Sequence, residues 1–335
     1  MKSIWQITAA TVILSIIATA APTTVKSEIK GKQQLTQTTL EVSQKHYNSG
    51  FIKFQMGDYK GAIKEFNAAL AIDSNNEEIY KNLGRAKFKL GDYSGAIGEY
   101  TKAIELKPAA SRAYNYRGNA KFQLKEYREA IADYTKAVKI QPDFALAYYS
   151  RANARKQLKD NRGAIADYSQ AINIKGDYAL AFHNRANTYY QEKEYQKAIA
   201  DYTKAIEINP NFVGTYNNRG LSKLRLKNYV GAIADFKSAI AIFPKYSLAY
   251  ANLGLAFKQQ GNYQAAIENL DRAIELNPSD AAAYLHRGVS MNKLGKTDLA
   301  IEDIQQAAQL AKQQGNSTLY REAEQIASKL TQKRS

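Results

Sequence analysis

The most constraining feature of the chain is a 34-residue repeat that recurs eight times from Ser43 to Gln314, without insertion or deletion. A fixed period of this length is typical of repeat proteins, in which each unit buries its apolar face against its neighbours. It predicts a quasi-one-dimensional array with an extended, curved surface. The eight copies occupy residues 43–76, 77–110, 111–144, 145–178, 179–212, 213–246, 247–280 and 281–314.

Small residues set the register of the copies, whose positions we count from the first residue of each. Alanine occupies positions 20 and 27 in all eight copies, for example Ala96 and Ala103. Glycine recurs at position 8 in six copies, although a glycine inside a helix costs about 0.5–1 kcal/mol relative to alanine. We therefore expect two closely packed helices per copy, at about positions 1–14 and 18–31, followed in five copies by a proline at position 32.

At these spacings the chain resembles the tetratricopeptide repeat family. The residues that carry the resemblance in the second copy are Leu83, Gly84, Tyr93, Ala96, Tyr100, Ala103 and Pro108. The resemblance implies an all-α fold: a right-handed superhelix, or solenoid, of eight helix pairs, with the first helices lining a groove that binds peptides or proteins. It implies no catalytic activity. Residues 315–335 contain an amphipathic segment, which we expect to be a capping helix followed by a short tail.

The N-terminal residues have a different character. A positive start, an apolar stretch and the small-residue site Ala18-Thr19-Ala20 predict that residues 1–20 are a secretory signal peptide. The alternative is an uncleaved membrane anchor at residues 4–21. Residues 21–42 are rich in Thr, Gln and Lys, which predicts a polar linker. The signal-peptide pattern therefore predicts an exported protein. The repeats resemble bacterial arrays, cyanobacterial ones among them, so the expected compartment is the periplasm, the thylakoid lumen or the medium.

The composition narrows the choice of partner. The chain has no cysteine and a formal net charge of +16, which favours acidic proteins, anionic membranes or nucleic acids as partners. The family resemblance places positions 2, 5, 6, 9, 12 and 13 of each first helix in the groove. The basic residues at these positions are Lys81, Arg85, Lys89, Arg112, Lys156, Arg225, Lys258 and Lys293, against one acid, Glu78. This imbalance predicts an acidic ligand.

The same groove positions carry many asparagines. They include Asn82, Asn119, Asn153, Asn184, Asn187, Asn218 and Asn252. An asparagine amide can donate to and accept from a peptide backbone, so the set suits an extended polar segment. The alternative is that these amides bond to a neighbouring helix.

A second pattern couples two positions inside the copy. Arginine at position 7 accompanies aspartate at position 23 in five copies, and both residues change together in the other three. We expect structural ion pairs between the two helices of one copy. The pairs are Arg117–Asp133, Arg151–Asp167, Arg185–Asp201, Arg219–Asp235 and Arg287–Asp303.

No motif points to an enzyme. The three histidines do not cluster with acids at metal-ligand spacing, so we expect no metal, no cofactor and no small-molecule substrate. The favoured function is a scaffold that binds a protein or peptide, for instance during assembly of an envelope or membrane complex. The alternative is binding of nucleic acid or another polyanion through the basic surface.

Overall fold

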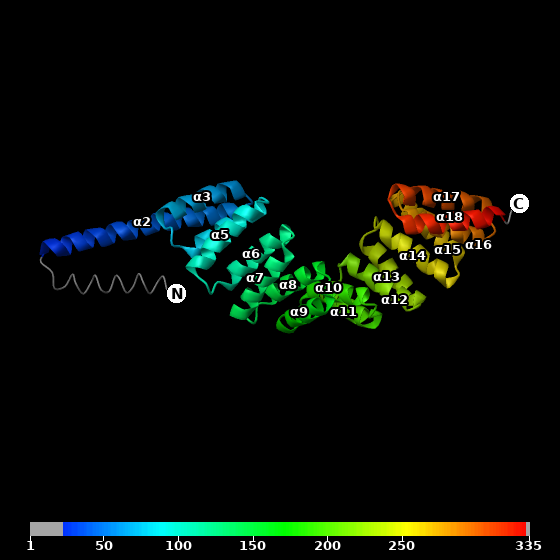
Figure 1. The fold of residues 1–335 in the computed structure, drawn as a ribbon, viewed down its shortest axis with the longest axis horizontal. Helices are drawn as coiled ribbons and strands as arrows, with labels where there is room; N and C mark the ends of the chain where they lie inside the picture. Colours follow the sequence, from blue (N-terminus) through cyan, green and yellow to red (C-terminus); the bar gives the residue numbers. More distant parts are fainter. Residues whose placement is uncertain (1–22, 333–335) are drawn as a thin grey trace. The chain divides into compact units, whose positions relative to one another are not determined.

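The computed structural model describes residues 23–332, with side chains from residue 36 onward. These residues form 17 helices and no strand (Figure 1). The predicted signal peptide or anchor, residues 1–20, lies outside the described residues.

The helices come in pairs that follow the 34-residue period. The first helices are α2 (Thr23–Gln55), α4 (Glu77–Lys89), α6 (Ser111–Gln123), α8 (Ala145–Gln157), α10 (Ala179–Gln191), α12 (Val213–Arg225), α14 (Ser247–Gln260) and α16 (Ala281–Lys293). The second helices are α3 (Tyr59–Ile72), α5 (Tyr93–Leu106), α7 (Tyr127–Ile140), α9 (Asn161–Ile174), α11 (Tyr195–Ile208), α13 (Tyr229–Ile242), α15 (Tyr263–Leu276) and α17 (Thr297–Gln313). A last helix, α18 (Ser317–Gln332), follows the eighth pair.

The polar segment 21–42 differs from the predicted linker, because from Thr23 it is helical and continues into the first copy as α2. No proline interrupts it after Pro22, and its many Gln, Lys, Glu and Leu residues are good helix formers. Almost all of its described side chains, from residue 36 to Val42, are exposed. This part of α2 is therefore solvated, as its composition indicates, but it is not irregular.

The turn between the two helices of a copy needs a left-handed residue. Glycine supplies it at Gly57, Gly91, Gly261 and Gly295. Lysine supplies it in the other four copies, with φ between 59° and 64°: Lys125, Lys159, Lys193 and Lys227. A lysine in this conformation costs about 1–2 kcal/mol. The next residue often caps the second helix, as Asp58 does by accepting from the backbone N–H of Gly61 at 2.8 Å.

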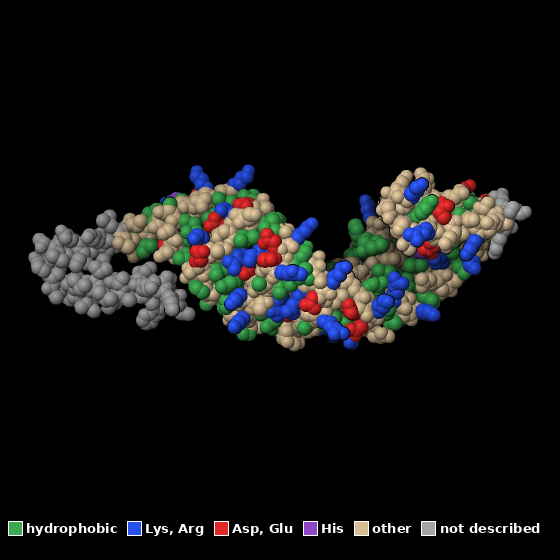
Figure 2. All heavy atoms as spheres, in the orientation of Figure 1, with side chains coloured by type: hydrophobic (Ala, Val, Ile, Leu, Met, Phe, Trp, Pro, Cys, Tyr) green, Lys and Arg blue, Asp and Glu red, His purple; other side chains and the backbone are tan. Residues whose placement is uncertain are grey.

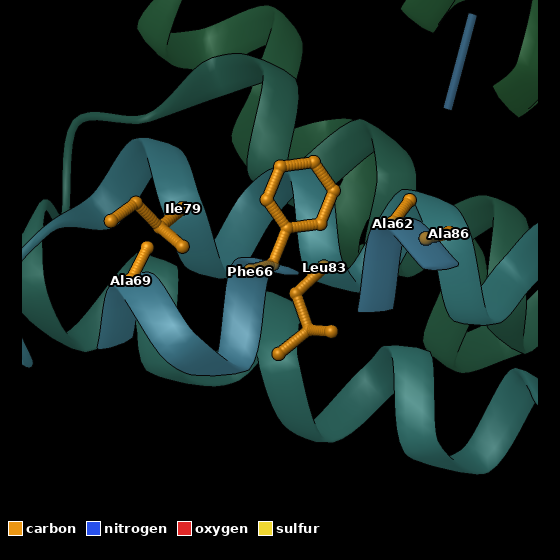
Figure 3. Packing of buried hydrophobic residues seen from close by; sticks show 6 residues of the cluster. All are labelled: Ala62, Phe66, Ala69, Ile79, Leu83 and Ala86. Atoms are coloured by element: carbon orange, nitrogen blue, oxygen red, sulfur yellow. The ribbon is translucent and has the colours of Figure 1, made fainter. Parts of the chain in front are cut away.

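Alanine and one large side chain at position 24 make up the core of each copy: an aromatic ring in the first six copies, Leu270 in the seventh and Ile304 in the eighth. The alanines at positions 20 and 27 are fully buried in all eight copies. Figure 3 shows the first case, where the ring of Phe66 lies among alanines of α3 and apolar residues of α4. Gly118 shows why position 8 is small, since a Cβ there would lie 2.7 Å from the ring of Tyr134. The helices of a pair therefore approach closely only across side chains no larger than a methyl group.

The chain divides into two compact units, Met1–Ala154 and Arg155–Ser335, and each is described by itself. From α2 to α7 in the first unit and from α9 to α18 in the second, each helix packs on the next one along the chain, which confirms the expected solenoid packing. Successive first helices also contact each other: α2–α4–α6 in the first unit and α10–α12–α14–α16 in the second. Among the described residues of either unit, successive second helices make no comparable contact. The first helices therefore form the inner side of each unit.

Helix α18 closes the C-terminal end, as predicted. It packs on α17 and α16, and its Ala323 is buried in a cluster with Leu285 and Ile304. The helix takes the place that the first helix of a ninth copy would have.

An arginine and an aspartate of the same copy form a two-bonded ion pair at four places in the described chain. Arg185 of α10 donates from Nε and Nη2 to Oδ2 and Oδ1 of Asp201 on α11, at 2.7 and 2.8 Å. The same arrangement joins Arg117–Asp133, Arg219–Asp235 and Arg287–Asp303. Arg151 and Asp167 belong to different units, and their pairing stays a prediction.

These arginines have a second partner residue, on the second helix of the preceding copy. Nη1 of Arg185 donates to Oγ of Ser169 on α9 at 2.8 Å. The residue at this place, position 25, is a hydroxyl or a carboxylate wherever arginine follows: Thr101, Thr135, Ser169, Thr203 and Asp271. Where leucine follows instead, position 25 differs: Asn67 before Leu83 and Lys237 before Leu253. Sequence reasoning missed this partner, although the co-variation was there to find.

A double-mutant cycle tests the network. Arg185→Leu or Asp201→Asn alone strands a largely buried charge, and each should lower the free energy of unfolding by about 3–5 kcal/mol. The double variant copies the seventh copy, which has Leu253 and Asn269, and should recover most of that loss. Urea denaturation measures both.

The exposed pair of Lys204 and Glu207 is the control, with a coupling energy below about 1 kcal/mol. Strictly additive losses at Arg185 and Asp201 would show that the pair does not act as a unit.

Candidate functional site

The residues at positions 2, 5, 6, 9, 12 and 13 of the first helices lie on the inner side of each unit, here called the inner face. Position 13 is exposed in every copy, whereas position 5 is buried in four copies, at Lys81, Asn115, Asn217 and Leu285. Helix α14 shows why the face is open. Positions 3, 7 and 10 of α14 are buried: Ala249, Leu253 and Ala256. Position 2 of the same helix, Leu248, is 47% exposed. The inner face is thus left uncovered by the packing that builds the array.

In the first unit, the most buried of the basic residues predicted to line the groove already have partners. Lys81 is buried and forms an ion pair with Glu78. The guanidinium of Arg85 lies 4.7 Å from the centre of the Phe54 ring and donates to Oδ1 of Asn82 at 2.7 Å. Lys89 of α4 and Arg112 of α6 are exposed.

The second unit holds a lysine without a counter-ion. Lys156 of α8 is half-buried, and it makes no ion pair with any residue between 23 and 332. Burial lowers the pKa of Lys156, because its charged form loses hydration that nothing replaces. Lys156 is therefore a cation placed to gain from a bound anion.

A histidine accompanies this lysine on the next first helix. Burial, aided by the charge of Lys156, lowers the pKa of His183 to about 4, so its ring is neutral at pH 7. The ring stacks on Phe212 with 4.5 Å between centres, and Nδ1 lies 2.8 Å from Oγ1 of Thr215. Sequence reasoning treated His183 as isolated, because the two residues lie on different helices and only the packing brings them together.

A second lysine–histidine pair lies further along the second unit. Nζ of Lys258 on α14 is 3.1 Å from Nδ1 of His286 on α16. Burial and the lysine charge lower the pKa of His286 to about 3, and burial lowers the pKa of Lys258. The carboxylate of Glu322 on α18 opposes the shift at Lys258. Nearby, exposed Arg225 donates from Nε to the hydroxyl of Tyr190 at 3.2 Å.

Many of the predicted asparagines bond within the array. Nδ2 of Asn218 donates to Oδ1 of Asn187 at 3.0 Å, and Nδ2 of Asn252 donates to Oδ1 of Asn217 at 2.9 Å. Each of these bonds joins one first helix to the next, as does that of Asn82 to the hydroxyl of Tyr47. Asn119 accepts from Tyr134, and Asn153 and Asn184 lie half-buried on the same surface. These contacts favour the alternative interpretation, in which the amides hold neighbouring helices together.

One buried asparagine side chain lacks hydrogen-bond partners in the described chain. Asn115 of α6 is fully buried, and neither of its side-chain polar atoms has a hydrogen-bond partner in the described chain. In the copy that has Asn217 at this position, Asn252 of the next first helix completes the pair, whereas the residue equivalent to Asn252 after Asn115 is the shorter Ser150. A buried polar group without a partner costs about 1–3 kcal/mol.

Two further kinds of site are absent from residues 23–332: metal sites and membrane-spanning helices. Between residues 23 and 332, no group of three or more His, Asp or Glu side chains is placed to hold a metal ion. No helix in this range is long and apolar enough to cross a membrane. The anchor considered at residues 4–21 lies outside that range.

Family models match most of the repeats. Two models described as "Tetratricopeptide repeat" match, one at residues 179–212 and 247–280 and the other at residues 145–178. The model described as "TPR repeat" matches residues 50–91, 84–125 and 118–159. Together the matches cover more than half of the chain. No curated protein matches the sequence.

Solved structures share the fold at low sequence identity. YrrB, described as a TPR protein with an unusual peptide-binding site, is 23% identical over 55% of this chain and 95% of its own, with a TM-score of 0.51. The C-terminal part of a TPR protein from Cytophaga hutchinsonii is 19% identical over 71% of this chain and 97% of that part, with a TM-score of 0.60. One from Parabacteroides merdae is 18% identical over 75% of this chain and 98% of its own, with a TM-score of 0.55. At these identities the likeness concerns the fold alone.

Proposed function

Because the chain belongs to the tetratricopeptide repeat family, whose members generally serve as non-enzymatic scaffolds for peptides or proteins, we propose that its inner face binds an acidic, extended segment of a partner protein. The observation that carries the proposal is Lys156, a half-buried lysine on the inner face without a carboxylate partner in the described chain. A ligand carboxylate would supply the missing charge and restore the stability of the ammonium form.

The distribution of charge on the inner face supports an acidic ligand. Its one acid, Glu78, is already paired with Lys81, so it does not offset the other cations. Clefts lined by one sign of charge focus the field on ligands of the opposite sign. YrrB, which shares the fold, is itself described as having a peptide-binding site.

The basic surface also favours a second candidate, a nucleic acid or another polyanion. Figure 2 shows Lys and Arg side chains spread over both units rather than gathered in one place. Such a spread suits non-specific, salt-sensitive binding to phosphates. The half-buried position of Lys156 instead suits a carboxylate carried on a narrow side chain, so we favour the peptide.

Export of the chain and a role in assembling an envelope complex belong to the same proposal. They rest on the signal-peptide pattern of residues 1–20, with an uncleaved anchor at residues 4–21 as the alternative. N-terminal sequencing of the protein isolated from its own cells should find a new N-terminus just after Ala20. An intact Met1 in a soluble cell fraction would contradict export.

Removal of the unpaired charge tests the binding proposal. A fluorescein-labelled peptide of alternating glutamate and serine should bind the full chain, and Lys156→Gln should weaken binding about tenfold, the effect of losing one charged hydrogen bond. Fluorescence anisotropy measures both affinities, and circular dichroism checks the fold.

Lys204→Gln is the matched control. Lys204 is exposed on a second helix and already paired with Glu207, so its loss should leave peptide affinity unchanged. Equal losses in both variants would mean that only the overall charge matters. Binding of single-stranded oligonucleotide alone, with a steep salt dependence, would favour the polyanion candidate.

A further inference from the structure

The inner face changes its chemistry within the second unit. The change is clearest at position 9, which lies half-buried on every first helix. From the first copy to the eighth, the residues at this position are Phe51, Arg85, Asn119, Asn153, Asn187, Leu221, Leu255 and Val289. Position 9 is therefore an amide in three consecutive copies and apolar in the last three.

Helix α14 carries the widest part of the apolar surface. Leu248, Ala251, Leu255 and Lys258 follow one another at spacings of three and four residues, so they form one stripe along the helix. Leu248 is 47% exposed, and the other three are half-buried. The stripe is apolar for about two turns, from Leu248 to Leu255, and ends in the cation Lys258.

The neighbouring first helices extend this stripe sideways. Helix α12, which brings Leu221, and helix α16, which brings Val289, both contact α14. Leu221 and Leu255 pack on the core cluster of Phe236 and Leu253, and Val289 packs on the C-terminal cluster of Leu285 and Ile304. We call Leu221, Leu248, Ala251, Leu255 and Val289, with Lys258 at their edge, the α14 patch.

Lys258 gives the patch its charge. Its one hydrogen-bond contact in the described chain is with Nδ1 of His286 at 3.1 Å. The imidazole is neutral at pH 7, because burial and the nearby ammonium lower the pKa of His286 to about 3. Glu322 of α18 acts on Lys258 from a distance and forms no ion pair with it. The ammonium therefore keeps an unsatisfied charge beside an apolar surface.

We propose that the α14 patch selects a segment in which leucine-like side chains flank a carboxylate, so that the apolar groups cover Leu248 and Leu255 while the carboxylate meets Lys258. This inference rests on the proposed function and narrows its ligand class. Burial of apolar surface contributes about 25 cal/mol per Å² in addition to the ion pair. Two of the amide-lined copies also expose a leucine at position 2, Leu146 or Leu180, but they have asparagine at position 9 where α14 has Leu255, so their apolar surface does not continue along the helix.

The test compares three labelled peptides of twelve residues on the full chain. The first has leucine at every third position among glutamates and serines, the second has serine for each leucine, and the third has glutamine for each glutamate. The first peptide should bind at least tenfold more tightly than either of the others.

Variants then locate the binding. Leu248→Gln should weaken binding of the leucine-containing peptide about fivefold, which corresponds to the loss of some 40 Å² of apolar contact. Leu299→Gln is its control, because Leu299 is 49% exposed on the second helix α17. Lys258→Gln should weaken the same peptide about tenfold, and Lys245→Gln, in the exposed turn before α14, should not.

The outcomes separate this inference from the proposed function. If the leucine-free acidic peptide binds as tightly as the leucine-containing one, the α14 patch has no ligand role, but acidic-segment binding stands. If Leu248→Gln and Leu299→Gln have equal effects, the inference is likewise overturned. If no acidic peptide binds, the proposed function itself fails.

Discussion

The structure depends on helices that approach one another across alanine and glycine. The alanines at positions 20 and 27 are fully buried in every copy, and a larger side chain at position 8 would meet a ring or a backbone carbonyl. Because the helices of a pair lie so close, a second helix can pack on two first helices within one unit, and successive first helices of the same unit also touch. The surface that remains open on the first helices is consequently an inner face of fixed register, at which every copy presents the same six positions.

The positively charged side chains fall into two groups, according to whether the chain provides a carboxylate or a hydroxyl partner for them. Below the inner face, arginines such as Arg185 donate to three acceptor atoms on two other helices. These bonds neutralise the guanidinium and join one copy to the next. On the inner face, Lys156 has no carboxylate, and Lys258 has only a neutral imidazole. The arginines that join the copies form ion pairs with carboxylates of the chain, whereas Lys156 and Lys258 form none in the described chain. That contrast, rather than the total charge, is what points to an acidic ligand.

Sequence periodicity was enough to predict the fold, because a strict 34-residue period leaves little freedom in helix number and pairing. The covariation of positions 7 and 23 also pointed to the right side chains, such as Arg185 and Asp201. What the sequence hid were contacts between copies. The pairing of Lys258 with His286 and the amide bond from Asn252 to Asn217 join residues about one repeat apart, and they depend on how far one helix is rotated against the next. The helical start of α2 was missed because polar composition alone does not separate a solvated helix from a linker.

The central claim is that the inner face holds half-buried lysines whose ammonium groups pair with a carboxylate of the ligand. Titration of the lysine side chains by NMR, with and without an acidic peptide, tests it most directly. In the free protein the pKa values of Lys156 and Lys258 should lie below the ordinary lysine value, because burial disfavours the charged form, and both should rise when the peptide binds. Ordinary pKa values in the free protein, or values that do not move on peptide binding, would contradict the account.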